Sequence, residues 1–330
     1  MNIGILGSGA WGSALANSAS VEHSVELWGR DPELLARMER DRRNDRYLPG
    51  IALRDSVRLN PQFQSACANK DLIVIATPAG GLRESLSRLR DFRCSTPVLW
   101  LCKGFERGTS KLPHQIAQEE LSGDARYGAL SGPSFAKDVA RGLPAAITLA
   151  SKDAQFAQEM GMALNSSRLR IYSSDDLTGV EVGGAVKNVI AIAAGISDGL
   201  GLGESARAAL ITRGLAELTR LGLGLGGKLE TFLGLAGAGD LLLTCTSDQS
   251  RNRKVGLALA LGEDLENILA RLGHVAEGVF SAKEALSLGE RLGVETPITK
   301  AVCGVLQGHL TPKAAVDELM RREPKRDAPV

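Results

Sequence analysis

Hydrophobic residues in the first half of the chain form short continuous runs, which alternate with segments whose hydrophobic positions recur at helical spacing. Continuous apolar runs are typical of strands covered on both faces, and strands that alternate with helices predict a doubly wound parallel sheet. Asp31-Pro32 predicts the start of one helix, with Asp31 as its N-cap and proline in the first turn. The predicted strands cover residues 3–6, 25–28, 71–76, 97–102, 127–130 and 145–150.

A glycine-rich turn follows the first predicted strand. Gly7, Gly9 and Gly12 have the spacing GxGxxG, and a helix-compatible stretch begins directly after them. In this order the first glycine permits a tight turn, the second lets the backbone approach a pyrophosphate, and the third lets helix and strand pack closely. The helix N-terminus then offers unpaired N–H groups to the phosphates. Glycine-rich turns occur for other reasons, but this position in the first βαβ unit favours a dinucleotide site.

The hydrophobic pattern changes after about residue 173. From Asp175 onward the chain is rich in Ala, Leu and Gly at helical spacing, and β-branched runs disappear. A length of 330 residues also favours two domains over one. We therefore predict an α/β protein, with an N-terminal Rossmann-type doubly wound sheet in residues 1–173 and an all-α C-terminal domain in residues 174–330.

Composition argues against several classes of function. The chain has 39 Lys and Arg against 38 Asp and Glu, so no overall basic charge favours nucleic acid or an anionic membrane as a partner. No apolar run approaches the ~20 residues of a membrane span, and the start does not have the pattern of a signal peptide. The five scattered cysteines predict reduced thiols in a cytoplasmic protein. The four histidines share no ligand spacing, so we expect no metal site.

The residues after the second predicted strand bear on the choice of cofactor. An acidic residue there binds the ribose 2′-hydroxyl of NAD, whereas an arginine accommodates the 2′-phosphate of NADP. This chain has Arg30 followed by Asp31, and we expect helix capping to occupy the carboxylate and leave Arg30 for a phosphate. The sequence therefore favours NADP(H) over NAD(H). A surface arginine in a loop, and use of both cofactors, stay open as alternatives.

Lys187 lies in an apolar helical segment that contains several glycines. On a helix its neighbours three and four positions away are Gly183, Gly184, Ile190 and Ala191, so it does not lie on a solvent face. Desolvation lowers the pKa of a lysine and suits it to accept a proton near neutral pH. The alternative is a lysine whose ammonium reaches water past its apolar neighbours. We favour a catalytic lysine, because the glycines clear space for a ligand or for another backbone.

Asp240 and Thr244 would share one helix face, so a carboxylate and a hydroxyl could converge on one substrate group. N-capping by Asp240 after Gly239 fits the same pattern equally well.

Several further residues suit ligand binding. Ser250, Arg251 and Asn252 offer donors that suit a phosphate monoester, although charge alone favours a solvated turn there. Lys103 ends one predicted strand, and a Gly-Pro turn follows another, at the edge where α/β sheets bind ligands. Glu277 offers a carboxylate in a loop and would by itself be a surface residue.

Taken together, these segments resemble the bacterial NAD(P)-dependent glycerol-3-phosphate dehydrogenases. The matching segments follow the order of the family and extend over nearly the whole chain, which makes the set far more specific than the glycine motif alone. They are residues 7–12, 47–50, 103–104, 130–136, 181–189, 212–217, 236–241 and 250–252.

The resemblance implies an enzyme that interconverts dihydroxyacetone phosphate and sn-glycerol 3-phosphate with NADP(H) or NAD(H), and so supplies the glycerol phosphate backbone of phospholipids. It implies that Lys187 is the proton acceptor for the C2 hydroxyl. The implied substrate contacts are Lys103, Gly132, Ser134, Lys187, Asp240, Ser250, Arg251 and Asn252. The cofactor contacts, including the glycines of the motif, are Gly7, Gly9, Ala10, Trp11, Gly12, Arg30, Asp31, Lys103, Ala136, Arg251, Val275 and Glu277.

The residue types indicate a mechanism, because lysine ammoniums near the carbonyl oxygen would stabilise the charge that hydride transfer creates and deliver the proton. Two other interpretations stay open. One is a dehydrogenase of the same architecture that acts on a β-hydroxy acid or a carboxylated ketone. The other is a non-enzymatic NADPH-binding sensor, against which the apolar surroundings of Lys187 argue. The oligomeric state, a homodimer included, is not indicated by the sequence.

Overall fold

The computed structural model describes residues 1–273 and 275–323, which divide into two compact units. The sheet unit comprises Met1–Cys102 and Pro113–Leu177. The helical unit comprises Lys103–Leu112 together with the described residues from Thr178 onward. The segment Lys103–Leu112 therefore leaves the sheet unit, packs as part of the helical unit and returns. The hydrophobic pattern along the chain does not indicate this excursion.

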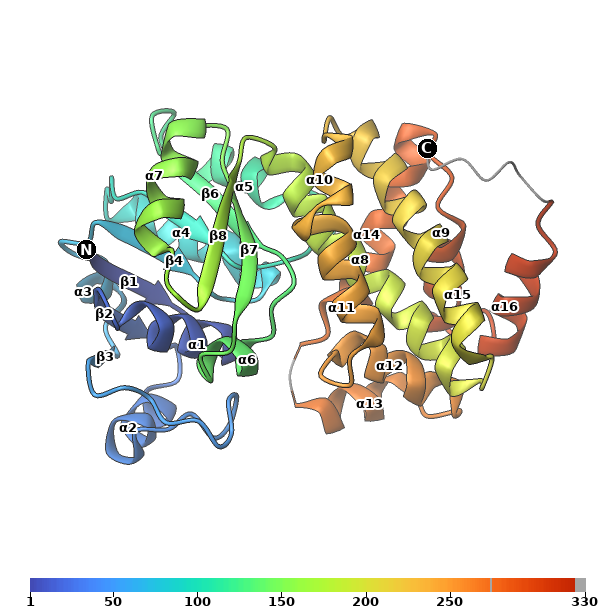
Figure 1. The fold of residues 1–330 in the computed structure, drawn as a ribbon, viewed down its shortest axis with the longest axis horizontal. Helices are drawn as coiled ribbons and strands as arrows, with labels where there is room; N and C mark the ends of the chain where they lie inside the picture. The colour runs from blue at the N-terminus through green and yellow to red at the C-terminus, as the bar shows by residue number, and fades with distance from the viewer. Residues whose placement is uncertain (274, 324–330) are drawn as a thin grey trace. The chain divides into compact units, whose positions relative to one another are not determined.

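The sheet unit is built on one eight-stranded sheet in the order β3-β2-β1-β4-β5-β6-β7-β8 (Figure 1). Neighbouring strands are parallel except for β6 and β7, so the prediction of a parallel sheet is wrong at this pair. The connection between them carries only the short helix α6 (Ala136–Ala140), which packs on α1 (Ala10–Ala19). Because no crossover carries the chain over the sheet, β7 runs back alongside β6. The strands are β1 (Asn2–Leu6), β2 (Ser24–Trp28), β3 (Val57–Asn60), β4 (Leu72–Ile75), β5 (Val98–Trp100), β6 (Tyr127–Ser131), β7 (Ala145–Ala150) and β8 (Leu169–Ser174).

All six predicted strands are present, and the hydrophobic pattern missed only β3 and β8. These two strands form the edges of the sheet. Their sequences, VRLN and LRIYSS, mix charged and polar residues with apolar ones, and several of their side chains are exposed. Edge strands meet solvent and do not need the continuous apolar run of an inner strand. The continuous apolar run from which we predicted strands is therefore weakest in the two edge strands.

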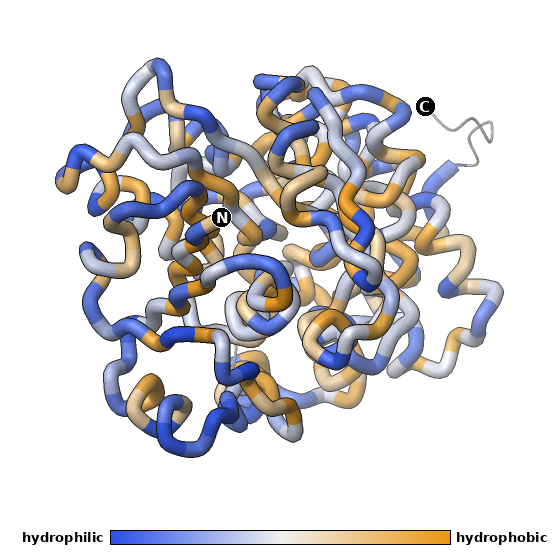
Figure 2. The backbone as a smooth tube through the Cα atoms, turned by 60° about the vertical axis from the view of Figure 1, so that its left-hand side comes forward, coloured by the Kyte–Doolittle hydropathy of each residue, from blue (hydrophilic) through white to orange (hydrophobic). Residues whose placement is uncertain are grey.

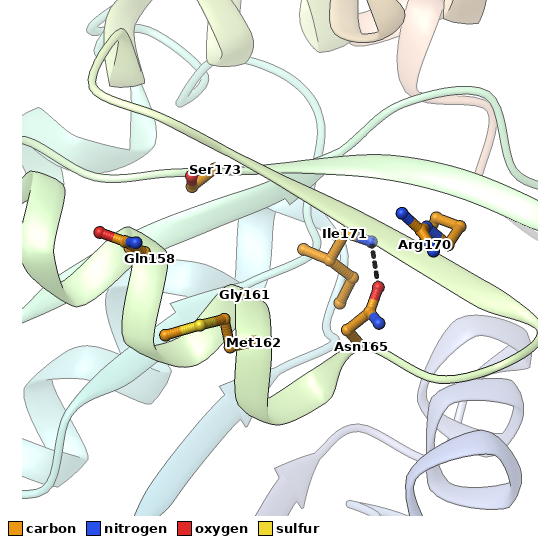
Figure 3. A pocket seen from close by; sticks show the side chains of 7 residues that line it. All are labelled: Gln158, Gly161, Met162, Asn165, Arg170, Ile171 and Ser173. Atoms are coloured by element: carbon orange, nitrogen blue, oxygen red, sulfur yellow. Dashed lines mark hydrogen bonds between the residues drawn. The ribbon is translucent and has the colours of Figure 1, made fainter.

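A cavity of about 280 Å³ lies between α7 (Ala154–Leu164) and the edge strand β8 (Figure 3). Asn165 lies at its rim and accepts a hydrogen bond from the backbone N–H of Ile171 at 3.2 Å. An edge strand with unpaired backbone groups can pair with another chain, and covering such a group reduces that tendency. The side chain of Asn165 therefore covers one backbone N–H group of this edge strand. Its lining residues are Gln158, Gly161, Met162, Asn165, Arg170, Ile171 and Ser173.

Helices and the sheet share one hydrophobic core in this unit, which includes Ile3, Val25, Leu72 and Phe156. The predicted cap is present: the carboxylate of Asp31 accepts a hydrogen bond from the N–H of Leu34 at 3.0 Å. The remaining helices are α2 (Pro32–Asp41), α3 (Phe63–Cys67), α4 (Leu82–Asp91), α5 (Pro113–Glu120) and the 3₁₀ turn η1 (Ala79–Gly81).

The helical unit contains no strand among its described residues, so the predicted all-α second part is confirmed. Hydrophobic and hydrophilic residues alternate along its helices (Figure 2), as expected for helices with one buried face. Its elements are α8 (Leu177–Gly199), α9 (Gly203–Gly224), α10 (Leu229–Leu233), the π-helical turn η2 (Leu235–Gly239), α11 (Asp240–Thr246), α12 (Arg251–Ala260), α13 (Leu265–Leu272), α14 (Glu277–Leu292), α15 (Pro297–Leu306) and α16 (Pro312–Met320).

From the sequence we expected no apolar run close to the length of a membrane span, and the central helix α8 shows that this expectation is wrong. It has 23 residues and a mean hydropathy of 1.4 over its most apolar stretch, so by length and composition it could cross a membrane. That stretch is wholly buried inside the helical unit. Burial against the surrounding helices accounts for its apolar composition, and α8 is a core helix of this unit.

Candidate functional site

The glycine turn before α1 has the local geometry that a dinucleotide needs. Gly7 has a φ of 127°, which side chains rarely adopt, and a Cβ on Gly12 would overlap the carbonyl oxygen of Gly7. Gly9 is the N-cap of α1, and no atom of the described residues lies within 4 Å of a Cβ placed on it. No side chain among them caps α1, so no side-chain cap occupies its first N–H groups. These features fit the pyrophosphate of a dinucleotide.

Asn44 supports this turn from the segment after α2, and the sequence analysis did not identify it. Its buried amide donates to the carbonyl of Ser8 at 2.8 Å and to the hydroxyl of Ser13 at 2.7 Å. Its carbonyl oxygen accepts a hydrogen bond from the N–H of Tyr47 at 3.4 Å. A single asparagine within a charged stretch gives no sequence signal, because its role depends on a partner about 30 residues away.

Asp31 and Arg30 lie at the carboxyl end of β2 in different environments. The carboxylate of Asp31 caps α2 and also pairs with Arg46 at 3.1 Å. The hydrogen bond from the Leu34 backbone is the main cause that holds the pKa of Asp31 below its ordinary value. Arg30 is exposed and makes no hydrogen bond or ion pair with the part of the chain that the structure describes. An available guanidinium beside a carboxylate that is already paired suits a phosphate group.

The Gly-Pro turn follows the carboxyl end of β6. The strands β1, β4, β5 and β6 are parallel, so this turn and the glycine turn lie at the same end of the strands. Gly132 has a φ of 138°, and a Cβ there would meet the Cα of Ile147 at 3.0 Å. The hydroxyl of Ser134 donates to the carbonyl of Gly132 at 3.1 Å, and Ala136 begins α6. The buried hydroxyls of Thr77 and Ser131, at the ends of β4 and β6, find no hydrogen-bond partner among the described residues.

The helical unit brings together four side chains that the sequence separates by up to 141 positions (244 − 103). The ammonium of Lys187 donates to Asp240 at 2.5 Å and to the hydroxyl of Thr244 at 2.8 Å. The ammonium of Lys103 donates to the other carboxylate oxygen of Asp240 at 2.6 Å. Asp240 is 1% exposed, so one buried carboxylate holds two ammonium groups. We call these four residues the lysine cluster.

Two local features place Asp240 beside Lys187. A Cβ on Gly183, one turn before Lys187 on α8, would overlap the carbonyl of Ala236, so only glycine allows this close approach. Ala236 lies in the π-helical turn η2, which leads directly into α11 at Asp240. π-helical turns are frequent at functional sites.

Both alternatives that the sequence pattern left open for these residues are wrong. Gly239, not Asp240, occupies the cap position of α11, and the Asp240 carboxylate faces the two lysines. Lys187 is 7% exposed, so its ammonium does not reach water past its neighbours.

The lysine cluster has perturbed electrostatics. Burial is the main cause that lowers the pKa of Lys187 to about 8; the positive charge of Lys103 acts in the same direction, and Asp240 opposes both. Burial also opposes ionisation of Asp240, but the charges of Lys103 and Lys187 outweigh that effect and hold its pKa below the ordinary value. A lysine that titrates near neutral pH can both donate and accept a proton under physiological conditions.

The cationic segment at 250–254 is a helix start and not the solvated turn that its charge favours. Ser250 caps α12, its hydroxyl oxygen accepting from the N–H of Arg253 at 3.2 Å. Arg251 is the first helical residue, is exposed, and interacts electrostatically with Glu277. The first N–H groups of α12 and the Arg251 guanidinium together form an anion-binding arrangement.

The side chain of Asn252 is engaged inside the helical unit. Its amide donates to the side chain of Asn188 at 2.8 Å, and its carbonyl oxygen accepts from the N–H of Gly278 at 3.0 Å. Asn188 follows Lys187 directly, so this buried hydrogen bond links the start of α12 to the lysine cluster. Gly278 lies in the first turn of α14, which begins at Glu277. Glu277 is half-buried and lies two residues after Val275.

Comparison with known proteins assigns the whole chain to one group. The family model described as NAD-dependent glycerol-3-phosphate dehydrogenase N-terminus matches residues 2–157, and the corresponding C-terminus model matches residues 176–317. Glycerol-3-phosphate dehydrogenase [NAD(P)+] of Dechloromonas aromatica is 55% identical over 99% of both chains. The enzyme of that name from Nitrosospira multiformis is 54% identical, again over 99% of both chains.

Solved structures give the same assignment. The crystal structure of glycerol-3-phosphate dehydrogenase from Coxiella burnetii has a TM-score of 0.93 and 40% identity, and the match covers 97% of this chain and 99% of that one. A D-mandelate dehydrogenase structure, at 16% identity, a TM-score of 0.64 and coverage of 96% and 99%, shares the fold alone. This chain therefore belongs to the NAD-dependent glycerol-3-phosphate dehydrogenase family.

Proposed function

We propose that this chain catalyses the NAD(P)-dependent interconversion of dihydroxyacetone phosphate and sn-glycerol 3-phosphate. The observation that carries the proposal is the buried hydrogen bond between Asn252 and Asn188. It joins the start of α12, where we propose that an anion binds, to the residue that follows Lys187, a lysine of lowered pKa. The substrate has the matching chemistry, with a phosphate at one end and a ketone or secondary alcohol at C2. Family membership supports the same reaction.

Lys187 is the proposed acid and base. In the direction of reduction its ammonium protonates the oxygen at C2, and in the direction of oxidation the neutral amine accepts the proton of the C2 hydroxyl. The ammonium of Lys103 stabilises negative charge that develops on that oxygen. Asp240 holds both ammonium groups, and Thr244 fixes the second contact of Lys187.

The phosphate end is bound at the start of α12. The Arg251 guanidinium, the Ser250 hydroxyl hydrogen and the first N–H groups of the helix act as donors. Asn252 acts here through its backbone, because its side chain already bonds Asn188 and Gly278. Binding energy from this end of the substrate positions the carbonyl at Lys187. Gly132 and Ser134 remain proposed substrate contacts from the sheet unit.

NAD(P)H, when bound, supplies the hydride that adds to C2. The glycine turn with Ala10 and Trp11 would hold the pyrophosphate, and Arg30 would pair with the 2′-phosphate of NADP(H). NAD(H) remains usable, because the capping role of Asp31 does not prevent an unphosphorylated ribose from binding. The other proposed cofactor contacts are Lys103, Ala136, Arg251, Val275 and Glu277.

Division of labour and location follow from the same proposal. Residues 1–173 mainly bind the cofactor and residues 174–330 mainly bind the substrate, and the segment Lys103–Leu112 acts together with residues 174–330. We place the reaction in the cytoplasm, because none of the five cysteines, all of which are described, forms a disulfide, as in proteins of a reducing compartment. Its product supplies the glycerol phosphate backbone for phospholipid synthesis.

One assay tests the proposed function. The purified protein is given dihydroxyacetone phosphate with NADPH, and separately with NADH, and consumption of each cofactor is followed by absorbance. We expect turnover with both and a higher kcat/KM with NADPH. A carboxylated ketone without phosphate serves as the competing substrate, and Lys187→Met as the inactive control. Faster turnover of the carboxylated ketone, or cofactor binding with no turnover of either substrate, would overturn the proposal.

A further inference from the structure

We infer that Glu284 is the positioning residue for Lys103: by fastening the segment Lys103–Leu112 to α14, it keeps the Lys103 ammonium at Asp240. The inference rests on the proposed function, because it assumes that Lys103 acts in the reaction. Glu284 lies outside every motif that the sequence analysis identified, and its role follows only from contacts within the helical unit.

Glu284 uses both carboxylate oxygens on one segment. One oxygen accepts from the N–H of Gly108 at 2.9 Å, and the other from the hydroxyl of Ser110 at 2.6 Å. Glu284 is 7% exposed and Ser110 is 6% exposed, so both hydrogen bonds are largely shielded from water. Hydrogen bonds to a buried carboxylate are stronger than those between neutral groups, and the donors become costly to leave unpaired.

The segment needs such an anchor, because the backbone at Gly108 and Ser110 adopts positive φ angles. Gly108 has a φ of 77° and Ser110 a φ of 55°. The left-handed region is disfavoured for a residue with a side chain such as Ser110, and it persists only where the surroundings determine it. The two hydrogen bonds to Glu284 flank this strained turn and hold it.

Apolar contacts fix the rest of the segment to the same unit. Phe105 and Leu112, near its two ends, are buried in the core of the helical unit. The guanidinium of Arg107 lies 3.3 Å from the ring centroid of Phe280, one turn before Glu284 on α14. Lys103 stands only two residues before Phe105. A displacement of the segment on α14 therefore carries Lys103 away from Asp240.

Loss of the anchor should affect the reaction through the charge of Lys103. The ammonium of Lys103 contributes to lowering the pKa of Lys187. If Lys103 moves away, the pKa of Lys187 rises. The fall of kcat/KM for ketone reduction at high pH, which we call the alkaline limb, then moves to higher pH. A general loss of stability would reduce the amount of active enzyme without moving that limb.

The test compares Glu284→Ala and Glu284→Gln with Lys103→Ala and with the double variant Lys103→Ala/Glu284→Ala. Glu217→Gln is the matched control: Glu217 is a buried carboxylate of the same unit that binds the N–H groups of Ile298 and Thr299 at 2.8 and 2.9 Å. For each variant we measure kcat and KM for dihydroxyacetone phosphate against pH, at saturating NADPH. Thermal unfolding and amide hydrogen exchange of residues 103–112 are measured without substrate.

Glu284→Ala should lower kcat/KM about tenfold or more, the effect of losing hydrogen bonds to a charged group. It should also move the alkaline limb to higher pH, as Lys103→Ala does, and speed exchange at Gly108. Glu284→Gln, which keeps one acceptor for Gly108, should recover part of each effect. The double variant should be no worse than Lys103→Ala, because Glu284 acts through Lys103. Glu217→Gln should lower stability and leave the pH profile unchanged.

Three results would overturn the inference: unchanged exchange at Gly108 in Glu284→Ala, an unmoved pH profile, or losses that multiply in the double variant. Full activity of Lys103→Ala is a different outcome. It would refute the proposed role of Lys103 in the reaction, and with it the catalytic part of this inference, while the exchange measurement would still report whether Glu284 anchors the segment.

Discussion

Replacing Asp240 with asparagine should shift the pH dependence of ketone reduction to lower pH. The variant keeps the size of the side chain but removes the charge that faces two ammonium groups, at 2.5 Å from Lys187 and 2.6 Å from Lys103. Asp240 raises the pKa of Lys187, whereas burial and Lys103 lower it. Without the carboxylate, only the lowering influences of burial and Lys103 remain, so the pKa of Lys187 should fall below about 8.

The size of the shift follows from electrostatics. Two unit charges about 4 Å apart attract by about 4 kcal/mol at an effective dielectric constant of about 20, and one pKa unit corresponds to about 1.4 kcal/mol. At that separation the attraction corresponds to about three pKa units. Because asparagine keeps a dipole toward Lys187 and the cluster relaxes, we expect a fall of about one to two units.

The assay is the pH dependence of kcat/KM for dihydroxyacetone phosphate, from about pH 6 to about pH 9.5, which reports groups of the free enzyme. Reduction needs protonated Lys187, so kcat/KM of the wild type should fall above pH of about 8, and that of the variant should fall from a lower pH. In the reverse direction kcat/KM should rise with pH through the same value.

Folding must be checked separately, since removing one charge from a buried cluster costs roughly 3–5 kcal/mol. Asp198→Asn is the control, because Asp198 pairs with Arg253 at 2.7 Å and Arg207 at 3.0 Å in the same unit. It should destabilise without moving the alkaline limb. A limb that stays in place in Asp240→Asn, or moves to higher pH, would refute the electrostatic account of the lysine cluster.

Four further variants test single steps. Lys187→Met should lower kcat by roughly 10²–10⁴-fold with the fold intact, and retention of more than about a tenth of the activity would show that Lys187 is structural. Arg30→Asp should weaken kcat/KM with NADPH far more than with NADH, and equal losses would contradict the 2′-phosphate assignment. Arg251→Ala should lower kcat/KM for dihydroxyacetone phosphate by about one to two orders of magnitude at saturating NADPH, and should lower it much less for dihydroxyacetone. An equal loss with both substrates would place the anion site elsewhere. Gly183→Ala should lower kcat, because its Cβ would overlap the carbonyl of Ala236 and displace Asp240. Its control is Gly161→Ala in α7, where a Cβ meets Ile171 at an ordinary 3.7 Å and activity should not change.

Local patterns in the sequence determined much of the fold. Inner strands are covered on both faces, so each leaves an apolar run, and all six such runs became strands. The cap by Asp31 and the glycine turn were predictable for the same reason, because each depends on residues only a few positions apart. The helical neighbours of Lys187 likewise indicated its burial, since a helix places residues three and four apart on one face.

Tertiary structure decided the partners. From the sequence, Asp240 could equally have capped a helix, and the close approach at Gly183 turned it toward Lys187. The excursion of Lys103–Leu112 into the helical unit, and the roles of Asn44 and Glu284, left no pattern at all. Periodicity records how residues a few positions apart share a face, whereas these contacts join residues dozens to more than a hundred positions apart. Only the packing of whole elements brings such residues within hydrogen-bond distance.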